Sequence, residues 1–378
     1  MGVPPRFGFY ILGLFSFAVF LRGGLVQSDR RLLLDSPCAS SSKTGNSTAS
    51  QPHRDDTSVT TVFTAPLETT PESCRRSALF PGQLPNYFVC PEHHQPQCQI
   101  ERHLYFVHGK SGSTTTDRLV KKNCPKYGER VNPQNVQASL RNVPKSFPPK
   151  EKTVLVQAEG VIPYRFFAEQ FQTIGNCYAS MFMMRDPWTR YQSDFAYRSR
   201  QERGRNDLYV HQNDSMESFM ERYANYVTAT LGDPQLHERC TRYSKSKDYS
   251  WPCYFQEARY RGPEILAHIL DNLRRDYTVV GLMEDLPTSM VLFQHAVGSD
   301  NKFCNQTGFL EMATFRRANA NKHKELDRSS EAYQQYRKYF WLDEILYDAV
   351  KVLYQEQVQK AQQIPALKAQ LDQLTSEA

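Results

Sequence analysis

The segment at residues 178–184 constrains the fold of this chain more than any other. It is a nearly uninterrupted apolar run, Tyr-Ala-Ser-Met-Phe-Met-Met. Such a run is typical of a strand buried on both faces, as in a parallel sheet covered by helices. Apolar runs at 104–108, 154–156 and 277–281 predict further strands. Because amphipathic stretches separate these runs, we expect an α/β domain with a parallel sheet flanked by helices.

Helical spacing of apolar residues marks the stretches between and after the strands. Helices are predicted at 113–122, 216–231, 264–275 and 330–357. The last of these repeats Leu342, Ile345, Leu346, Ala349 and Leu353 along one face, as expected for a helix that closes a core. Pro365 interrupts the pattern, so residues 356–378 are predicted to form a loose helical tail.

The N-terminal region predicts entry into the secretory pathway. Residues 7–26 form an apolar segment broken only by Arg22, which suits a single membrane anchor after a cytosolic tail at 1–6. A signal peptide cleaved near residues 26–28 is the alternative. Residues 27–99, rich in Ser, Thr and Pro, are expected to form an extended stem before a lumenal domain at 100–355.

Composition excludes several classes of protein. Hydrophobic residues make up 40% of the 378, which is too many for a wholly disordered chain. One apolar segment is too few for a polytopic membrane protein. The net charge, 46 − 40 = +6, is too small to indicate a nucleic-acid partner.

Cysteines and sequons fit a lumenal chain. Nine cysteines leave at least one unpaired, and the first predicted disulfide is Cys240–Cys253, with Cys90–Cys98 second. The alternative use of cysteines, a zinc site, lacks any Cys-x2-Cys pair, so no metal is expected. N-glycosylation sequons begin at Asn46, Asn213 and Asn305.

The first candidate site follows the strand at 104–108. A Gly/Ser-rich turn there leads into a predicted helix, and such a junction offers backbone N–H groups and a positive helix end to an anion. Its charged and hydroxyl side chains are Lys110, Ser111, Ser113, Thr114 and Thr115. The alternative is an ordinary turn before a capped helix.

The second candidate site follows the apolar run at 178–184. It reads Arg185-Asp-Pro-Trp-Thr-Arg-Tyr-Gln-Ser193, with a proline at the start of a predicted helix. Arg185 and Ser193 could reach one phosphate, the arginine through forked hydrogen bonds. The alternative is a structural ion pair of Arg185 with Asp186 at the sheet edge.

Together, in this order and about seventy residues apart, the two motifs resemble the nucleotide-binding segments of PAPS-dependent carbohydrate sulfotransferases, closest to the heparan sulfate 2-O- and 6-O-sulfotransferase group. The segment from Gly109 through Lys110, Ser111, Gly112, Ser113 and Thr114 is similar to the family's 5′-phosphosulfate loop. The Arg-Asp-Pro-x-x-Arg-x-x-Ser motif is similar to its 3′-phosphate segment. Residues 279–284 and 342–349 are also similar to this group, so the resemblance covers about 100–355.

This resemblance implies a P-loop-like fold, a lumenal Golgi location as a single-pass type II membrane protein, and sulfuryl transfer from PAPS to a glycan hydroxyl without a metal. Lys110 would stabilise the leaving phosphate, and Arg185 and Ser193 would hold the 3′-phosphate. The histidine base of the 2-O/6-O group is missing, so Glu159 is the candidate base and His108 the weaker alternative.

Basic residues after the second motif suit an anionic glycan acceptor. Arg198, Arg200 and Arg203 are the candidates, with a solvated surface as the ordinary interpretation. Two rival functions stay open: a catalytically inactive lumenal glycan-binding protein that keeps the sulfotransferase fold, and a P-loop-like kinase, which would need an acidic metal ligand.

Overall fold

The structure is a computed structural model of the whole chain. It describes Cys74, residues 83–93 and 102–107, Ser111, and residues 155–158, 178–201, 215–232, 251–297 and 327–376. All of them belong to one compact unit, Ala49–Ala378. No helix in these described ranges has the length and apolarity needed to cross a membrane. The expected membrane segment at 7–26 lies outside them.

Four strands form a parallel sheet in the order β2-β1-β3-β4. They are β1 (Arg102–Val107), β2 (Leu155–Ala158), β3 (Tyr178–Met184) and β4 (Val279–Leu282). In the register, β1 and β3 pair Val107 with Met183, and β3 and β4 pair Met184 with Leu282. Strands therefore lie where the apolar runs predict them, and β3 has the predicted bounds.

The centre of the sheet is fully buried. From Met181 to Met184 every β3 residue has no exposed surface, as expected for a strand covered on both faces. On β4, a Cβ atom at Gly281 would lie 2.8 Å from the Met181 side chain and 2.9 Å from Cβ of Ser289. Glycine at this position therefore lets β3 and the helix after β4 approach closely.

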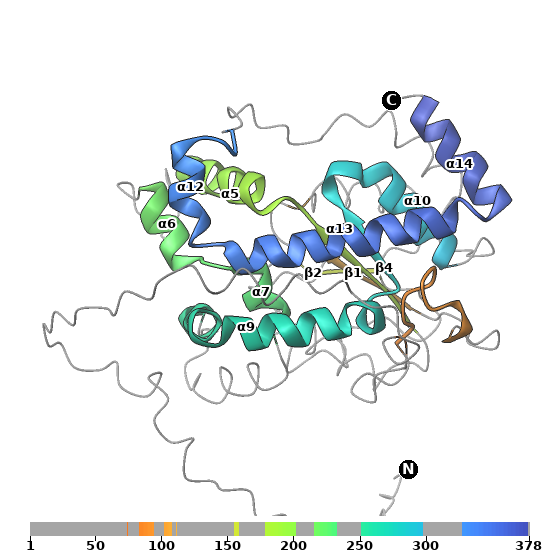
Figure 1. Cartoon of the computed structure of the whole chain (residues 1–378), viewed down its shortest axis with the longest axis horizontal. Helices are drawn as coiled ribbons and strands as arrows, with labels where there is room; N and C mark the ends of the chain where they lie inside the picture. The colour runs from red at the N-terminus through yellow and green to blue at the C-terminus, as the bar shows by residue number, and fades with distance from the viewer. Residues whose placement is uncertain are drawn as a thin grey trace, which may run out of the picture. The chain divides into compact units, whose positions relative to one another are not determined.

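Helices cover the sheet and continue beyond it (Figure 1). After β3 come α5 (Pro187–Gln201), α6 (Met216–Arg222), α7 (Tyr226–Leu231) and α9 (Trp251–Asp276). After β4 come the 3₁₀ turn η6 (Met283–Asp285), α10 (Leu286–Ala296), α12 (Glu331–Arg337), α13 (Trp341–Ala361) and α14 (Pro365–Ser376). In Figure 1 the long helix α13 runs across the strands and alongside α9, and both helices contact each other.

Two predicted helices are each broken in the structure. The stretch 216–231 breaks at Asn225, whose φ of 51° lies in the left-handed region, and the stretch 330–357 breaks at residues 338–340. The two breaks lie together, because the Asn225 backbone N–H donates to the carbonyl of Tyr339 at 3.0 Å. Apolar periodicity misses both breaks because it continues across them.

The predicted stem, 27–99, is wrong in its C-terminal part. Residues 83–93, which end in the 3₁₀ turn η5 (Pro91–His93), pack at the amino end of the sheet. The Asn86 N–H donates to the carbonyl of Arg274 and the Tyr87 N–H to that of Thr278. Leu84 and Phe88 are buried in the same place. A Ser/Thr/Pro-rich composition marks the region before this segment but does not mark where the fold begins.

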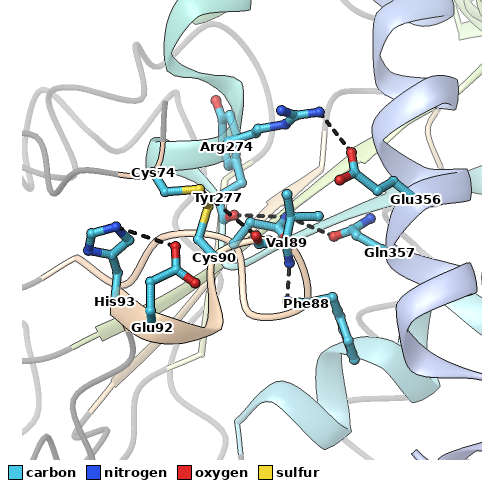
Figure 2. The surroundings of a disulfide bond; sticks show 11 residues. Cys74, Phe88, Val89, Cys90, Glu92, His93, Arg274, Tyr277, Glu356 and Gln357 are labelled. Carbon is cyan, nitrogen blue, oxygen red and sulfur yellow. Dashed lines mark hydrogen bonds and ion pairs between the residues drawn. A yellow bond between two sulfur atoms is a disulfide. The ribbon is translucent and has the colours of Figure 1, made fainter. Parts of the chain in front are cut away.

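The disulfide prediction for Cys90 is also wrong. Cys90 is bonded to Cys74, with a Cα–Cα distance of 5.5 Å, and not to Cys98 (Figure 2). The bond ties residue 74 to the turn at 86–90, beside an ion pair between Arg274 on α9 and Glu356 on α13. Closeness in sequence favoured Cys98, whereas the packing of residues 83–93 decides the partner.

The C-terminal tail is not loose. The predicted boundary between 355 and 356 falls inside α13, which continues to Ala361. Helix α14 buries Leu367, Leu371 and Leu374 and contacts α10. Pro365 is the first residue of α14, where a proline is tolerated, so it starts a new helix that packs on the domain.

Candidate functional site

The strand order places the candidate site at the carboxyl edge of the sheet. The chain runs from β1 out to β2, then crosses β1 to reach β3 and β4. The order therefore reverses between β1 and β3. In open parallel sheets, ligands bind outside the carboxyl ends of the strands at such a switch point. The two predicted phosphate segments follow the two strands that flank it.

The segment after β1 contributes a buried hydroxyl. Ser111 comes four residues after the end of β1 and is 1% exposed. Within the described residues its Oγ has no hydrogen-bond partner. A buried hydroxyl without a partner is costly, so this position suits a bound acceptor such as a phosphate oxygen. Lys110, Gly112, Ser113, Thr114 and Thr115 lie outside the described residues.

The segment after β3 is fixed by its own side chains. Asp186 is the last residue before α5, and its Oδ1 accepts the Thr189 N–H at 2.9 Å, which caps the helix. Pro187 occupies the first helical position, where no N–H is needed. The helix end therefore has a fixed direction relative to β3.

Arg185 is held to the same turn. The arginine is half-buried, and its Nε donates to Thr189 Oγ1 at 3.1 Å. The Thr189 hydroxyl in turn donates to the Asp186 carbonyl at 3.1 Å. An arginine fixed at a helix N-terminus provides positive charge where the helix dipole also favours an anion.

Ser193 lies on the same helix but further along it. It is 6% exposed and sits seven residues, or about 10 Å along the helix axis, beyond Asp186. The structure thus places both members of the predicted 3′-phosphate pair on α5 and the turn before it. Their meeting at one phosphate remains a prediction.

Arg190, in the middle of the second motif, has a structural environment. Its guanidinium lies 4.1 Å from the ring centroid of Tyr191 and 4.4 Å from that of Tyr226. It also pairs with Asp194 at 3.8 Å and is 1% exposed. Arg190 therefore anchors α5 to α7, and the motif combines a packing arginine with the candidate ligand Arg185.

Two residues from other elements support the turn after β3. Glu284 in η6 accepts the Asp186 backbone N–H through Oε1 at 2.9 Å. Arg328, just before α12, forms an ion pair with Asp186 Oδ2. Glu284 falls in the stretch 279–284, which resembles the sulfotransferase group. Arg328 had no local signal, because its partner is distant in the chain and no motif surrounds it.

A buried carboxylate holds the last long helix against α7. Asp343 on α13 is fully buried and accepts the N–H groups of Val227 and Thr228 and the Thr228 hydroxyl. Burial raises the pKa of Asp343, while the charge of Arg190 and these donors lower it. In return, Asn225 Oδ1 accepts the Leu342 N–H at 2.9 Å. Apolar periodicity predicts this helix but gives no signal for the two side-chain caps.

Most of the remaining predicted site residues lie outside the residues that the structure describes. Arg198 and Arg200 lie in the last turns of α5, though only their backbone is described, and Arg203 lies beyond it. Cys253 belongs to α9 without a described side chain. Six further predicted residues also lie outside the described ranges: Cys240, His108, Glu159, Asn46, Asn213 and Asn305. The strand β2 ends at Ala158, one residue before Glu159.

No group of three or more His, Cys, Asp or Glu side chains that could hold a metal occurs among the described residues. Comparison with known proteins gives no match to any family model, and no curated protein matches the chain.

Proposed function

We propose that this chain is a PAPS-dependent carbohydrate O-sulfotransferase. The observation that carries the proposal is the switch point between β1 and β3, where the Lys110 segment and the Arg185 segment follow adjacent parallel strands. Such an edge gathers the groups that a doubly phosphorylated nucleotide needs. The P-loop-like arrangement of the sulfotransferase fold is part of this proposal.

The donor would lie along this edge with its two phosphate ends at different strands. The loop after β1, including Gly112 and Ser113, would hold the 5′-phosphosulfate, and the buried Ser111 hydroxyl fits that environment. Arg185 and Ser193 would hold the 3′-phosphate at the start of α5. PAPS supplies the sulfuryl group, and adenosine 3′,5′-bisphosphate is the product.

Three groups of residues in this chain would act in the transfer. Glu159 would accept the proton from the glycan hydroxyl as its oxygen forms a bond to sulfur. In line with it, the bond between sulfur and the bridging phosphate oxygen would break. Lys110 would stabilise the negative charge that develops on that oxygen. Arg198, Arg200 and Arg203 would bind an anionic glycan acceptor.

The proposed location is the Golgi lumen, with a membrane anchor at residues 7–26. The Cys74–Cys90 disulfide supports an oxidising compartment, where such bonds form and persist. Sequons at Asn46, Asn213 and Asn305 suit the same side of the membrane.

Labelled-sulfate transfer from PAPS to a panel of desulfated glycans tests the proposal. We expect transfer by the parent, none by Lys110→Ala, and strongly reduced transfer by Glu159→Gln with unchanged nucleotide affinity. Lys360→Ala, at an exposed position on α13, is the matched control and should keep full activity.

The outcomes separate the rival functions. Binding of adenosine 3′,5′-bisphosphate without transfer to any glycan would show a glycan-binding protein that has lost activity. Mg²⁺-dependent use of ATP would show a kinase. Full activity of Glu159→Gln would remove the base assignment alone.

A further inference from the structure

Asp186 is held by three separate elements of the fold. Its carboxylate caps α5 through Thr189, its backbone N–H donates to Glu284 after β4, and its Oδ2 pairs with Arg328 before α12. The Asp186 side chain is only 10% exposed, whereas that of Arg328 is 52% exposed. The ion pair thus joins a buried carboxylate to an arginine at the surface of the site.

Arg328 is presented by a well-defined turn. The Ser330 N–H donates to the Asp327 carbonyl at 3.0 Å, and the Ser329 N–H donates to Asp327 Oδ1 at 3.0 Å. Ser330 then caps α12 by accepting the Tyr333 N–H at 3.2 Å. Trp188 on α5 packs edge-on against Tyr333, with ring centroids 5.5 Å apart, and Figure 1 shows α12 beside α5. The backbone that carries Arg328 is therefore fixed relative to α5.

A short series of contacts connects Arg328 to Arg185. Arg328 holds the Asp186 carboxylate, that carboxylate holds the Thr189 N–H, and the Thr189 hydroxyl accepts from Arg185 Nε. Arg328 can thus affect the direction of the Arg185 side chain without touching a ligand.

The charges at this turn support such an arrangement. The Asp186 carboxylate and Glu284, which accepts the Asp186 N–H, both belong to the turn that carries Arg185, where the proposed 3′-phosphate would bind. Without Arg328, the Asp186 carboxylate would repel the phosphate and compete with it for the Arg185 guanidinium. With Arg328 in place, Asp186 has a separate partner.

We propose that Arg328 is a positioning residue for 3′-phosphate recognition, which acts through Asp186 and Thr189 to set the direction of the Arg185 side chain. This inference rests on the proposed function and names a specificity determinant for the same site. It predicts that Arg328 matters for the 3′-phosphate and not for the rest of the nucleotide.

The test compares two nucleotides that differ only in the 3′-phosphate. Calorimetry measures binding of adenosine 3′,5′-bisphosphate and adenosine 5′-phosphate to the purified full chain and its variants. We expect Arg328→Ala to weaken bisphosphate binding about tenfold, the size typical of coupling within one hydrogen-bond network. Binding of adenosine 5′-phosphate should be unchanged, and Arg328→Lys should restore part of the loss because it keeps the charge.

Arg337→Ala is the matched control. Arg337 is 56% exposed and pairs with Glu344, which is 12% exposed, so the exposed fractions of this pair nearly equal those of the Arg328–Asp186 pair. Its removal should leave the ratio of the two affinities unchanged. A double-mutant cycle adds Asp186→Asn: if Arg328 acts through Asp186, the two changes should be clearly non-additive.

The outcomes are distinct for the two proposals. If the parent does not prefer the bisphosphate, the proposed function fails. If the parent prefers it and Arg328→Ala keeps the same preference, the positioning role is overturned and the function stands. Additive effects of Arg328→Ala and Asp186→Asn would also overturn the positioning role, because Arg328 would then act independently of Asp186.

Discussion

The carboxylate of Asp343 on α13 accepts both the backbone N–H and the hydroxyl of Thr228 on α7, each at 2.8 Å. It caps a helix that begins more than a hundred residues earlier in the chain, and it lies fully buried. The charge of a buried carboxylate is tolerated only when donors surround it. Together with the Asn225 Oδ1 that accepts the Leu342 N–H, this side chain therefore joins α7 to α13.

Replacing Asp343 should strongly destabilise the protein. Asp343→Ala leaves the N–H groups of Val227 and Thr228 buried without an acceptor, and we expect a loss of about 3 kcal/mol in the free energy of unfolding. Urea-induced unfolding measures this loss. Asp348→Ala on the same helix, where the side chain is 72% exposed, should change it little. Equal effects of the two variants would contradict the cap.

Titration of the buried Asp276 carboxyl should make the free energy of unfolding fall as pH rises. Burial raises its pKa from 3.8 to about 7, with Arg275 acting in the opposite direction. Between about pH 4 and pH 7 the folded state holds a proton that the unfolded chain has released, so the slope of stability against pH is negative in this window. Three pKa units correspond to a penalty of about 4 kcal/mol above pH 7.

The variant Asp276→Asn removes this titration. Relative to the parent, it should gain stability progressively from pH 4 to pH 7, measured by urea unfolding across that range. Asp271→Asn, an exposed position on the same helix α9, is the control and should follow the parent at every pH. A constant difference between Asp276→Asn and the parent would show that Asp276 does not titrate in this window.

Mass spectrometry of a tryptic digest can detect the Cys74–Cys90 disulfide. Trypsin cleaves after Arg54, Arg75, Arg76 and Arg102, so Cys74 falls in peptide 55–75 while Cys90 and Cys98 share peptide 77–102. Without reductant, mass spectrometry should find these two peptides joined, and reduction should separate them. A Cys90–Cys98 bond would instead lie within the single peptide 77–102.

Local patterns predict part of this structure well. The apolar run 178–184 forms β3 with the predicted bounds, because a strand buried on both faces leaves a signal in consecutive residues. The Asp-Pro pair after it marks the start of α5, because both residues act within the first turn.

Contacts between distant residues leave no such signal. Arg328 meets Asp186, and Asp343 meets Thr228, across long stretches of chain, and each is one charged residue among many in its own neighbourhood. The helix breaks near Asn225 and Tyr339 depend on the same long-range contacts, so periodicity predicts continuous helices there. Residues 83–93 look like the end of a stem because their packing partners follow about 190 residues later.

Arg185 should determine recognition of the 3′-phosphate. Arg185→Ala removes a forked donor from the start of α5, and we expect about 30-fold weaker binding of adenosine 3′,5′-bisphosphate in calorimetry. Binding of adenosine 5′-phosphate should be preserved. Arg259→Ala, at an exposed position on α9, is the control. Equal weakening of both nucleotides would indicate a general loss of structure at the site.

Gln357 should be needed to hold α13 on the sheet. Its amide is fully buried and completes both backbone hydrogen bonds of Val280 on β4, accepting the N–H at 3.0 Å and donating to the carbonyl at 2.9 Å. Its oxygen also accepts from the Asn86 amide at 2.8 Å, so one side chain joins β4, α13 and residues 83–93.

Gln357→Leu keeps a similar volume but removes all three hydrogen bonds. Because the Val280 and Asn86 groups then stay buried without partners, we expect a loss of about 3 kcal/mol in the free energy of unfolding. Hydrogen exchange of the Val280 amide should also accelerate relative to the parent. Gln355→Leu, an exposed position on the same helix, controls for the change in composition. If Gln357→Leu unfolded at the same urea concentration as Gln355→Leu, the hydrogen bonds of the Gln357 side chain to β4 would not stabilise the fold.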